Sequence, residues 1–207
     1  MFGLIEVHYQ SVVASIPPAH VSDYDWLVEN LRHVGEAEYQ ARYRKFWAMN
    51  AARLSPNYCT EYFRRLEAAA GSLPALGGLV TDLYKVPAQS KGRQSLQFSF
   101  ATKLLHMQDR HSPIYDSQVS AFHFFREPDH ALDLQQRVKR LEDFHGFLRR
   151  EYARVLADGL LTRSIAAFRA KFKPVHFTEE KVIDSLIWAF VSLLRSGGLR
   201  NGSVVYR

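Results

Sequence analysis

A short stretch in the middle of the chain, Gln97 to Val119, carries the side chains best suited to chemistry. It reads QFSFATKLLHMQDRHSPIYDSQV, which is a run of aromatic and small residues, a polar turn, and then Asp116 at the start of another expected helix. Free backbone N–H groups and the positive end of the helix dipole hold such a carboxylate ionised. Asp116 is therefore a candidate catalytic carboxylate, and a purely structural N-cap is the alternative interpretation.

Motifs typical of common enzyme classes are missing. The sequence contains no HExxH, no pair of CxxC, no P-loop and no GxSxG, and so gives no support to a zinc protease, a zinc finger, a nucleotide triphosphatase or a classical hydrolase. Cys59 is expected to be a small buried side chain. His106 and His111 bracket the polar turn without forming a convincing metal pair, and we expect neither a metal nor another cofactor.

The Gln97–Val119 segment resembles the helix-hairpin-helix DNA glycosylase superfamily, and most closely its 8-oxoguanine-glycosylase-like variant branch. There a phrase of the form S-F-A-[ST]-K-x-L-H precedes P-I-[YW]-D-S-x-V, and this chain matches both at Ser99–His106 and Pro113–Val119. The resemblance implies an all-α, two-lobed helical bundle with the hairpin-like element at about residues 93–126. It also implies an enzyme that flips a damaged base out of DNA and cleaves its N-glycosidic bond, and 8-oxoguanine is the candidate base.

The resemblance assigns roles to individual residues. Asp116 would stabilise the sugar cation as the bond breaks, or help to activate the nucleophile. Lys103 matches the lysine of the variant phrase and is the first candidate for a nucleophile that forms a Schiff base with the sugar, which requires desolvation to lower the pKa of its amine. Lys91 is the second candidate, and an activated water would replace both if neither reached the sugar.

Other residues complete the expected site. His106 and Tyr115 are candidates for the base pocket, with packing between helices as the alternative. The chain departs from the standard hairpin, whose Gly-x-Gly lets the backbone approach phosphate, because Ser95-Leu96-Gln97 stands at about that place. The residues expected to contact DNA are Lys91, Arg93, Ser99 and Arg110.

Positive charge is concentrated in the middle of the chain. The 27 basic against 21 acidic side chains give a net charge of +6, although the first 31 residues hold four acids and no Lys or Arg. This distribution favours an anionic partner, of which nucleic acid is the most common. The alternative interpretation is that the basic side chains only solvate the exposed faces of helices.

Apolar residues recur with a helical period almost throughout, which predicts an all-α protein. Ser55 followed by Pro56 predicts one helix start. Residues 85–94 are the clearest expected loop, and Gly197, Gly198 and Gly202 predict a flexible tail. The expected helices span Asp23–Val34, Glu36–Leu54, Pro56–Ala70, Leu76–Tyr84, Ser95–Met107, Gln118–Arg126, Asp133–Ala157, Thr162–Phe172 and Thr178–Leu194.

The 207 residues suffice for one compact helical domain or two helical lobes. The longest apolar stretch, Ile183–Leu194, is interrupted by Asp184 and is shorter than the roughly 20 residues that cross a bilayer, so no membrane partner is expected. A lone cysteine and an N-terminus without signal-peptide features predict a cytoplasmic protein, which we expect to be a monomer.

Two further hypotheses stay open. The missing hairpin glycines are compatible with a non-catalytic DNA-binding module that has a degenerate glycosylase fold. A helical protein-interaction domain that recognises an acidic protein surface also fits the basic composition.

Overall fold

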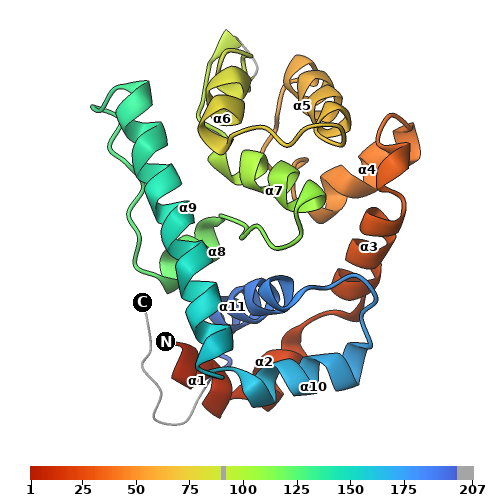
Figure 1. Ribbon diagram of the computed structural model, residues 1–207, viewed down its shortest axis with the longest axis vertical. Coiled ribbons are helices and arrows are strands. Elements are labelled where there is room, and N and C mark those ends of the chain that lie inside the picture. Colours follow the sequence, from red (N-terminus) through yellow and green to blue (C-terminus); the bar gives the residue numbers. More distant parts are fainter. Residues whose placement is uncertain (90–91, 200–207) are drawn as a thin grey trace.

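The computed structural model describes residues 1–89 and 92–199. Within these ranges the chain forms eleven α-helices, one short 3-10 helix and no strand (Figure 1), which confirms the predicted all-α fold. The helices are α1 (Phe2–Val7), α2 (Tyr9–Ser15), α3 (Pro18–Glu29), η1 (Leu31–His33), α4 (Ala37–Phe46), α5 (Pro56–Ala68), α6 (Leu76–Tyr84), α7 (Phe98–Gln108), α8 (Ser117–Phe122), α9 (Leu134–Ala157), α10 (Thr162–Phe172) and α11 (Glu179–Arg195).

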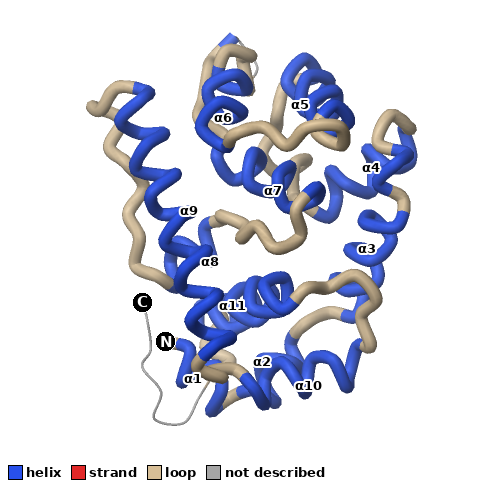
Figure 2. The backbone as a smooth tube through the Cα atoms, viewed as in Figure 1, coloured by secondary structure: helices blue, strands red, loops and turns tan. Residues whose placement is uncertain are grey.

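The helices gather in an upper and a lower group in the view of Figure 1. The upper group holds α4 to α7 and the lower group holds α1, α2, α10 and α11, while α3 and α9 run along the two sides. The turn between α7 and α8 lies in the middle, between the two groups (Figure 2). Segments that are distant in sequence therefore meet around this turn.

Two helices, α7 and α11, are buried on nearly all sides. Every residue from Ala101 to Met107 in α7 is buried, and so is almost every residue from Lys181 to Val191 in α11. A helix that is covered all round belongs in a protein core. Polar side chains on these two helices are consequently held in place by dense packing.

Local sequence signals explain several helix boundaries. Ser55 Oγ accepts a hydrogen bond from the Tyr58 backbone N–H, which confirms the predicted start of α5. The helix expected over residues 36–54 instead ends at Phe46, because Ala48 and Arg53 adopt left-handed φ angles of 56° and 51°. Helix α8 ends before the predicted Arg126, since a φ of 55° at Phe124 breaks it.

The N-terminal part of the fold differs most from expectation. Helix α3 begins at Pro18, in the first helical position that proline favours, and not at Asp23. The short helices α1 and α2 have no counterpart among the expected helices. None of the helices within residues 1–89 and 92–199 combines the length and apolar character needed to span a membrane.

Candidate functional site

A cavity of about 190 Å³ lies among α3, α4, α7, α8 and α11. Both signs of charge and several flat rings face it, which is an unusual lining for the interior of a helical protein. The charged side chains are Lys103, Asp116, Lys181 and Asp184. The ring-bearing side chains are His20, Phe46, Trp47 and Trp188.

Asp116 is the N-cap of α8 and also lines the cavity. Its Oδ1 accepts hydrogen bonds from the backbone N–H groups of Gln118, at 2.8 Å, and Val119, at 2.9 Å. Oδ2 makes no hydrogen bond within the described part of the chain. Capping thus occupies one oxygen of the carboxylate and leaves the other for chemistry in the cavity.

Two buried histidines hold the turn that leads to Asp116. His106 donates from Nδ1 to the Ser112 carbonyl at 2.8 Å, and His145 of α9 donates from Nε2 to the Pro113 carbonyl at 2.9 Å. Because a carbonyl only accepts, these contacts fix the tautomers of both rings. Burial lowers the pKa of both histidines, that of His106 to about 3, and both stay neutral at physiological pH.

Further contacts fix the same turn from α7 and α11. The Tyr115 backbone N–H donates to Thr102 Oγ1 at 3.1 Å. Thr178, the N-cap of α11, donates to the Arg110 carbonyl at 2.9 Å. Helices from both groups therefore position Asp116, which gives its carboxylate the rigid support that a catalytic group requires.

Lys103 points into the cavity from the buried helix α7. Its side chain is only 8% exposed, and its Nζ donates to Ser99 Oγ at 3.1 Å. The ammonium also lies 4.9 Å from the ring centre of Phe100 and 5.7 Å from that of Trp47. Desolvation lowers the pKa of Lys103, while Asp116 opposes the shift. A buried lysine with a lowered pKa meets the requirement for an amine nucleophile.

Lys181 and Asp184 form a buried ion pair on α11. Lys181 Nζ lies 2.7 Å from Asp184 Oδ2, and the two residues are 1% and 7% exposed. Asp184 Oδ1 is buried without a hydrogen-bond partner in the described part of the chain. Burial raises the pKa of Asp184, and Lys181 opposes that shift. An unpaired buried acceptor is costly to the stability of the fold.

The rings form a stacked wall beside these charges. His20 lies between Phe46, with 5.3 Å between ring centres and 29° between planes, and Trp188, at 5.7 Å and 8°. Trp47 packs edge-on against Phe46 with ring centres 4.6 Å apart. Such surfaces suit a flat aromatic ligand.

The structure brings Lys103 and Asp116 together, as the sequence predicted, and places two other predicted residues elsewhere. His106 is 1% exposed and does not line this cavity; its Nε2 accepts from Tyr24 Oη at 2.8 Å. Tyr115 lines a separate cavity of about 170 Å³, together with Ser99, and donates to Glu127 at 3.1 Å. Neither side chain lines the cavity that contains Lys103 and Asp116.

Of the predicted DNA contacts, Arg93 and Arg110 are exposed on the surface. Ser99 is partly buried and, as described, accepts the hydrogen bond of the Lys103 ammonium. Lys91 lies outside the described residues.

Sequence reasoning missed most of the charged and ring-bearing side chains of the cavity, including His20, Lys181 and Asp184. Asp184 had left a signal, because a charged residue interrupts the longest apolar stretch of the chain. His20 and Lys181 lay in ordinary amphipathic segments with no pattern to separate them from surface residues. Only the folded chain brings α3 and α11 next to α7.

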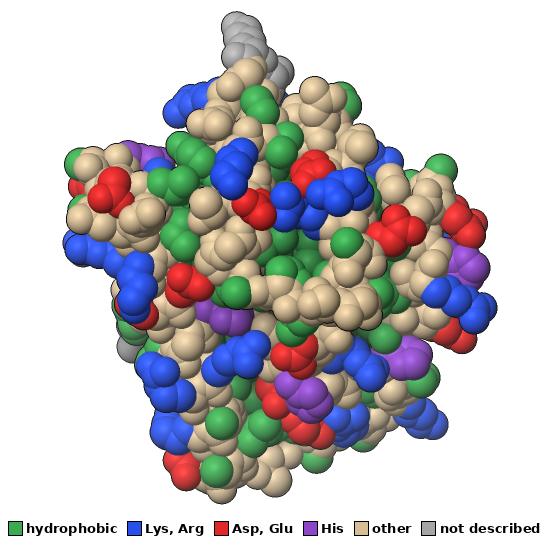
Figure 3. All heavy atoms as spheres, turned by 45° about the horizontal axis from the view of Figure 1, so that its top comes forward, with side chains coloured by type: hydrophobic (Ala, Val, Ile, Leu, Met, Phe, Trp, Pro, Cys, Tyr) green, Lys and Arg blue, Asp and Glu red, His purple; other side chains and the backbone are tan. Residues whose placement is uncertain are grey.

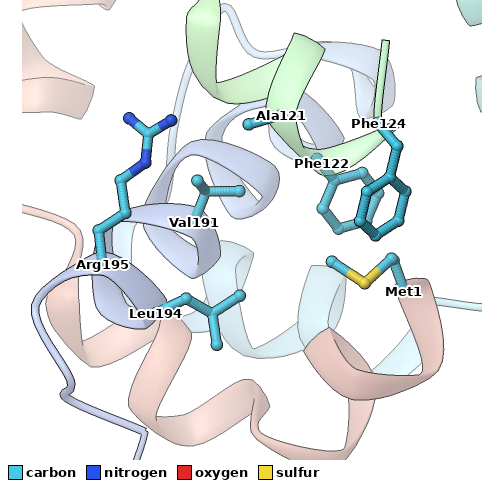
Figure 4. A pocket seen from close by; sticks show the side chains of 7 residues that line it. All are labelled: Met1, Ala121, Phe122, Phe124, Val191, Leu194 and Arg195. Atoms are coloured by element: carbon cyan, nitrogen blue, oxygen red, sulfur yellow. The ribbon is translucent and has the colours of Figure 1, made fainter. Parts of the chain in front are cut away.

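A larger cavity of about 290 Å³ is less suited to chemistry. It lies beside α8 and the C-terminal end of α11 and is lined mostly by apolar side chains such as Phe122, Val191 and Leu194. Arg195 has the one charged side chain among the described residues that line it, and Figure 4 shows the Arg195 guanidinium directed away from the phenylalanine rings.

Among the described residues, no group of three or more His, Cys, Asp or Glu side chains is arranged to hold a metal ion. Cys59 is partly buried, and burial raises the pKa of its thiol. No protein-family model, curated protein or solved structure matches the chain.

Proposed function

We propose that this protein is a DNA glycosylase with associated lyase activity, of the two-lobed helix-hairpin-helix type, acting as a cytoplasmic monomer. One observation carries the proposal: a desolvated lysine, Lys103, and a carboxylate with one open oxygen, Asp116, share a ring-lined cavity. The sequence resemblance reached the same two residues from their motif alone.

The chemistry follows from these two groups. The amine of Lys103 attacks C1′ of the sugar, the C1′–N bond breaks, and its electron pair leaves with the base, which takes up a proton. The amine then loses a proton, and the Schiff base forms as the C1′–O4′ bond of the sugar ring breaks and O4′ takes up a proton. Oδ2 of Asp116 offsets the positive charge that develops on the sugar.

The cavity fits a single extruded base. Its volume of about 190 Å³ is below the roughly 300–1,000 Å³ of drug-sized pockets, which suits one small planar group. The rings of Phe46 and Trp188 offer stacking surfaces, Lys181 offers a donor, and the carboxylates of Asp116 and Asp184 offer acceptors. A base with both carbonyl and N–H groups, such as 8-oxoguanine, complements this set.

DNA binding is supported by the net charge of +6 and by the exposed Arg93 and Arg110. On the face shown in Figure 3, Lys and Arg side chains form several groups with acidic side chains between them. We expect separate phosphate contacts and not one continuous basic patch, with affinity that falls as salt rises.

The test uses purified full-length protein and duplexes that each carry one damaged base, with 8-oxoguanine first. We expect release of the base and, after addition of borohydride, a covalent protein–DNA adduct. Lys103→Gln should abolish the adduct, and the surface variant Lys139→Gln should retain it. Asp116→Asn should abolish base release.

Two outcomes would contradict the proposal. Salt-dependent DNA binding with no base released from a broad panel of lesions would favour a non-catalytic DNA-binding module. Undetectable DNA binding at about 50 mM salt, where phosphate contacts are strong, would favour the protein-interaction domain.

A further inference from the structure

A hydrogen bond from the Lys103 amine joins two successive turns of α7. Side chains of an α-helix lean toward its N-terminus, and residues four apart lie on the same face. Lys103 therefore reaches back to Ser99, and Nζ donates to Ser99 Oγ at 3.1 Å. Within residues 1–89 and 92–199 this is the one hydrogen bond that Nζ makes. The direction of the amine thus depends on a single hydroxyl.

The other contacts of Lys103 depend on its positive charge. The ring centres of Phe100 and Trp47 lie 4.9 Å and 5.7 Å from Nζ, and such rings attract an ammonium through their π electrons. Desolvation lowers the pKa of Lys103, and the carboxylate of Asp116 opposes the shift by favouring the charged form. The nucleophile has to be the free amine, to which these attractions no longer apply. Ser99 Oγ is neutral and accepts a hydrogen bond from the amine as well as from the ammonium.

We propose that Ser99 is a positioning residue for the nucleophile: its Oγ accepts one N–H of the free Lys103 amine and so directs the lone pair of Nζ into the cavity. This inference rests on the proposed glycosylase function. Ser99 then acts through Lys103, and this role replaces the DNA contact that the sequence predicted for it.

Ser99 and Lys103 line different cavities. Lys103 faces the cavity that contains Asp116, whereas Ser99 lines the separate cavity of about 170 Å³ together with Tyr115 and Glu127. A cavity with polar walls and this volume has room for ordered water, which accepts the hydroxyl hydrogen of Ser99. With its hydrogen used there, Ser99 Oγ stays an acceptor toward Lys103, and the lone pair of the amine stays available for the sugar.

Positioning matters because a lysine amine sits on a flexible four-carbon stem. Fixing such a side chain costs conformational entropy, and an amine already directed at C1′ avoids most of that cost in the transition state. A misplacement of about 1 Å can slow a reaction about a hundredfold. Loss of the Ser99 acceptor should therefore slow the attack by at least about tenfold.

The experiment measures how fast the borohydride-trapped adduct forms in a single turnover, with the whole protein in excess over an 8-oxoguanine duplex, across a range of pH. In Ser99→Ala the plateau rate at high pH should fall at least about tenfold. The rising part of the profile should move to lower pH, because the ammonium loses an acceptor that favours the charged form. An amine that is free more often and yet attacks more slowly has lost its positioning.

Three controls separate this role from others. Ser99→Thr keeps a hydroxyl at the same place and should restore most of the rate. Ser192→Ala is the matched control, because Ser192 is also a half-buried helical serine and lines neither cavity. The affinity of Ser99→Ala for the duplex should equal that of wild type. Alanine is the best helix former, so this variant should fold, and circular dichroism checks that it does.

A second measurement needs no DNA. Acetylation of Lys103 by acetic anhydride at a series of pH values, quantified by mass spectrometry of its peptide, titrates the amine in the whole protein. The titration should move to lower pH in Ser99→Ala and should stay in place in Ser192→Ala.

The two proposals fail in different ways. If wild type forms the adduct but Ser99→Ala keeps the full plateau rate, or loses affinity for DNA and not rate, the role of Ser99 is wrong and the glycosylase assignment stands. An unchanged titration of Lys103 in Ser99→Ala would contradict the hydrogen bond itself. If wild type releases no base and forms no adduct, both proposals are wrong.

Discussion

The strongest test of how the site is built is the substitution His106→Phe. The ring of phenylalanine preserves most of the volume but removes two buried hydrogen bonds, one to the Ser112 carbonyl and one from Tyr24 Oη. Each buried partner left unsatisfied costs about 1–3 kcal/mol. The free energy of unfolding should therefore fall by about 2–6 kcal/mol at pH 7, which is a large part of the stability of a typical domain.

The same residue makes a separate contribution to pH dependence. The pKa of His106 is about 3 in the folded protein because burial disfavours the charged ring, whereas the usual value of a histidine is 6.5. As the pH falls below 6.5 the unfolded chain takes up a proton that the folded chain does not, so stability is lost on acidification. Between pH 7 and pH 5 the loss from this one residue is about 2 kcal/mol.

Urea unfolding at pH 7 and pH 5, followed by circular dichroism, measures both effects. His106→Phe should be less stable than wild type at pH 7 and should lose less stability on going to pH 5, while the exposed His130→Gln should match wild type at both. A variant with wild-type stability, or with an unchanged loss between the two pH values, would refute the structural role that we assign to His106.

Three further outcomes follow from the geometry. Asp116→Asn should keep its stability within about 0.5 kcal/mol in thermal melts, because asparagine caps a helix as well as aspartate does, whereas Asp116→Ala should lose about 1 kcal/mol. The pKa of Lys103 is lowered in the folded protein, so the unfolded chain binds more protons than the folded chain between pH 7 and pH 9. The free energy of unfolding of wild type should therefore rise over this pH range relative to that of Lys103→Met, and denaturant titrations at each pH measure the difference. Ala48→Gly should raise the free energy of unfolding by up to about 1 kcal/mol, because glycine adopts a positive φ without strain, and calorimetry would detect a drop as a contradiction.

Local signals determined how much of the fold could be predicted. Ser55-Pro56 is a cap followed by a first-turn proline, and the structure places a helix start there. Thr162–Phe172 also begins and ends where its apolar period does. By contrast, nothing in the sequence marks the positive φ angles at Ala48 and Phe124, which shorten two expected helices.

The residues of the candidate site likewise differ in whether a local sequence signal predicts them. Asp116 and Lys103 lie in one contiguous segment, where a cap signal and a motif can be recognised without knowledge of the fold. His20, Lys181 and Asp184 reach the cavity from two helices that are separated by more than half of the chain. Their function depends on long-range packing, and no local pattern encodes it.

The two lysines of the cavity are distinguished by their partners. Lys181 is paired with the carboxylate of Asp184 at 2.7 Å. The hydrogen bond of Lys103 goes instead to the neutral hydroxyl of Ser99, and desolvation favours its free amine. The same cavity thus contains one amine suited to attack and one ammonium suited to bind a carbonyl. This division of roles gives Lys103, and not Lys181, the part of the nucleophile.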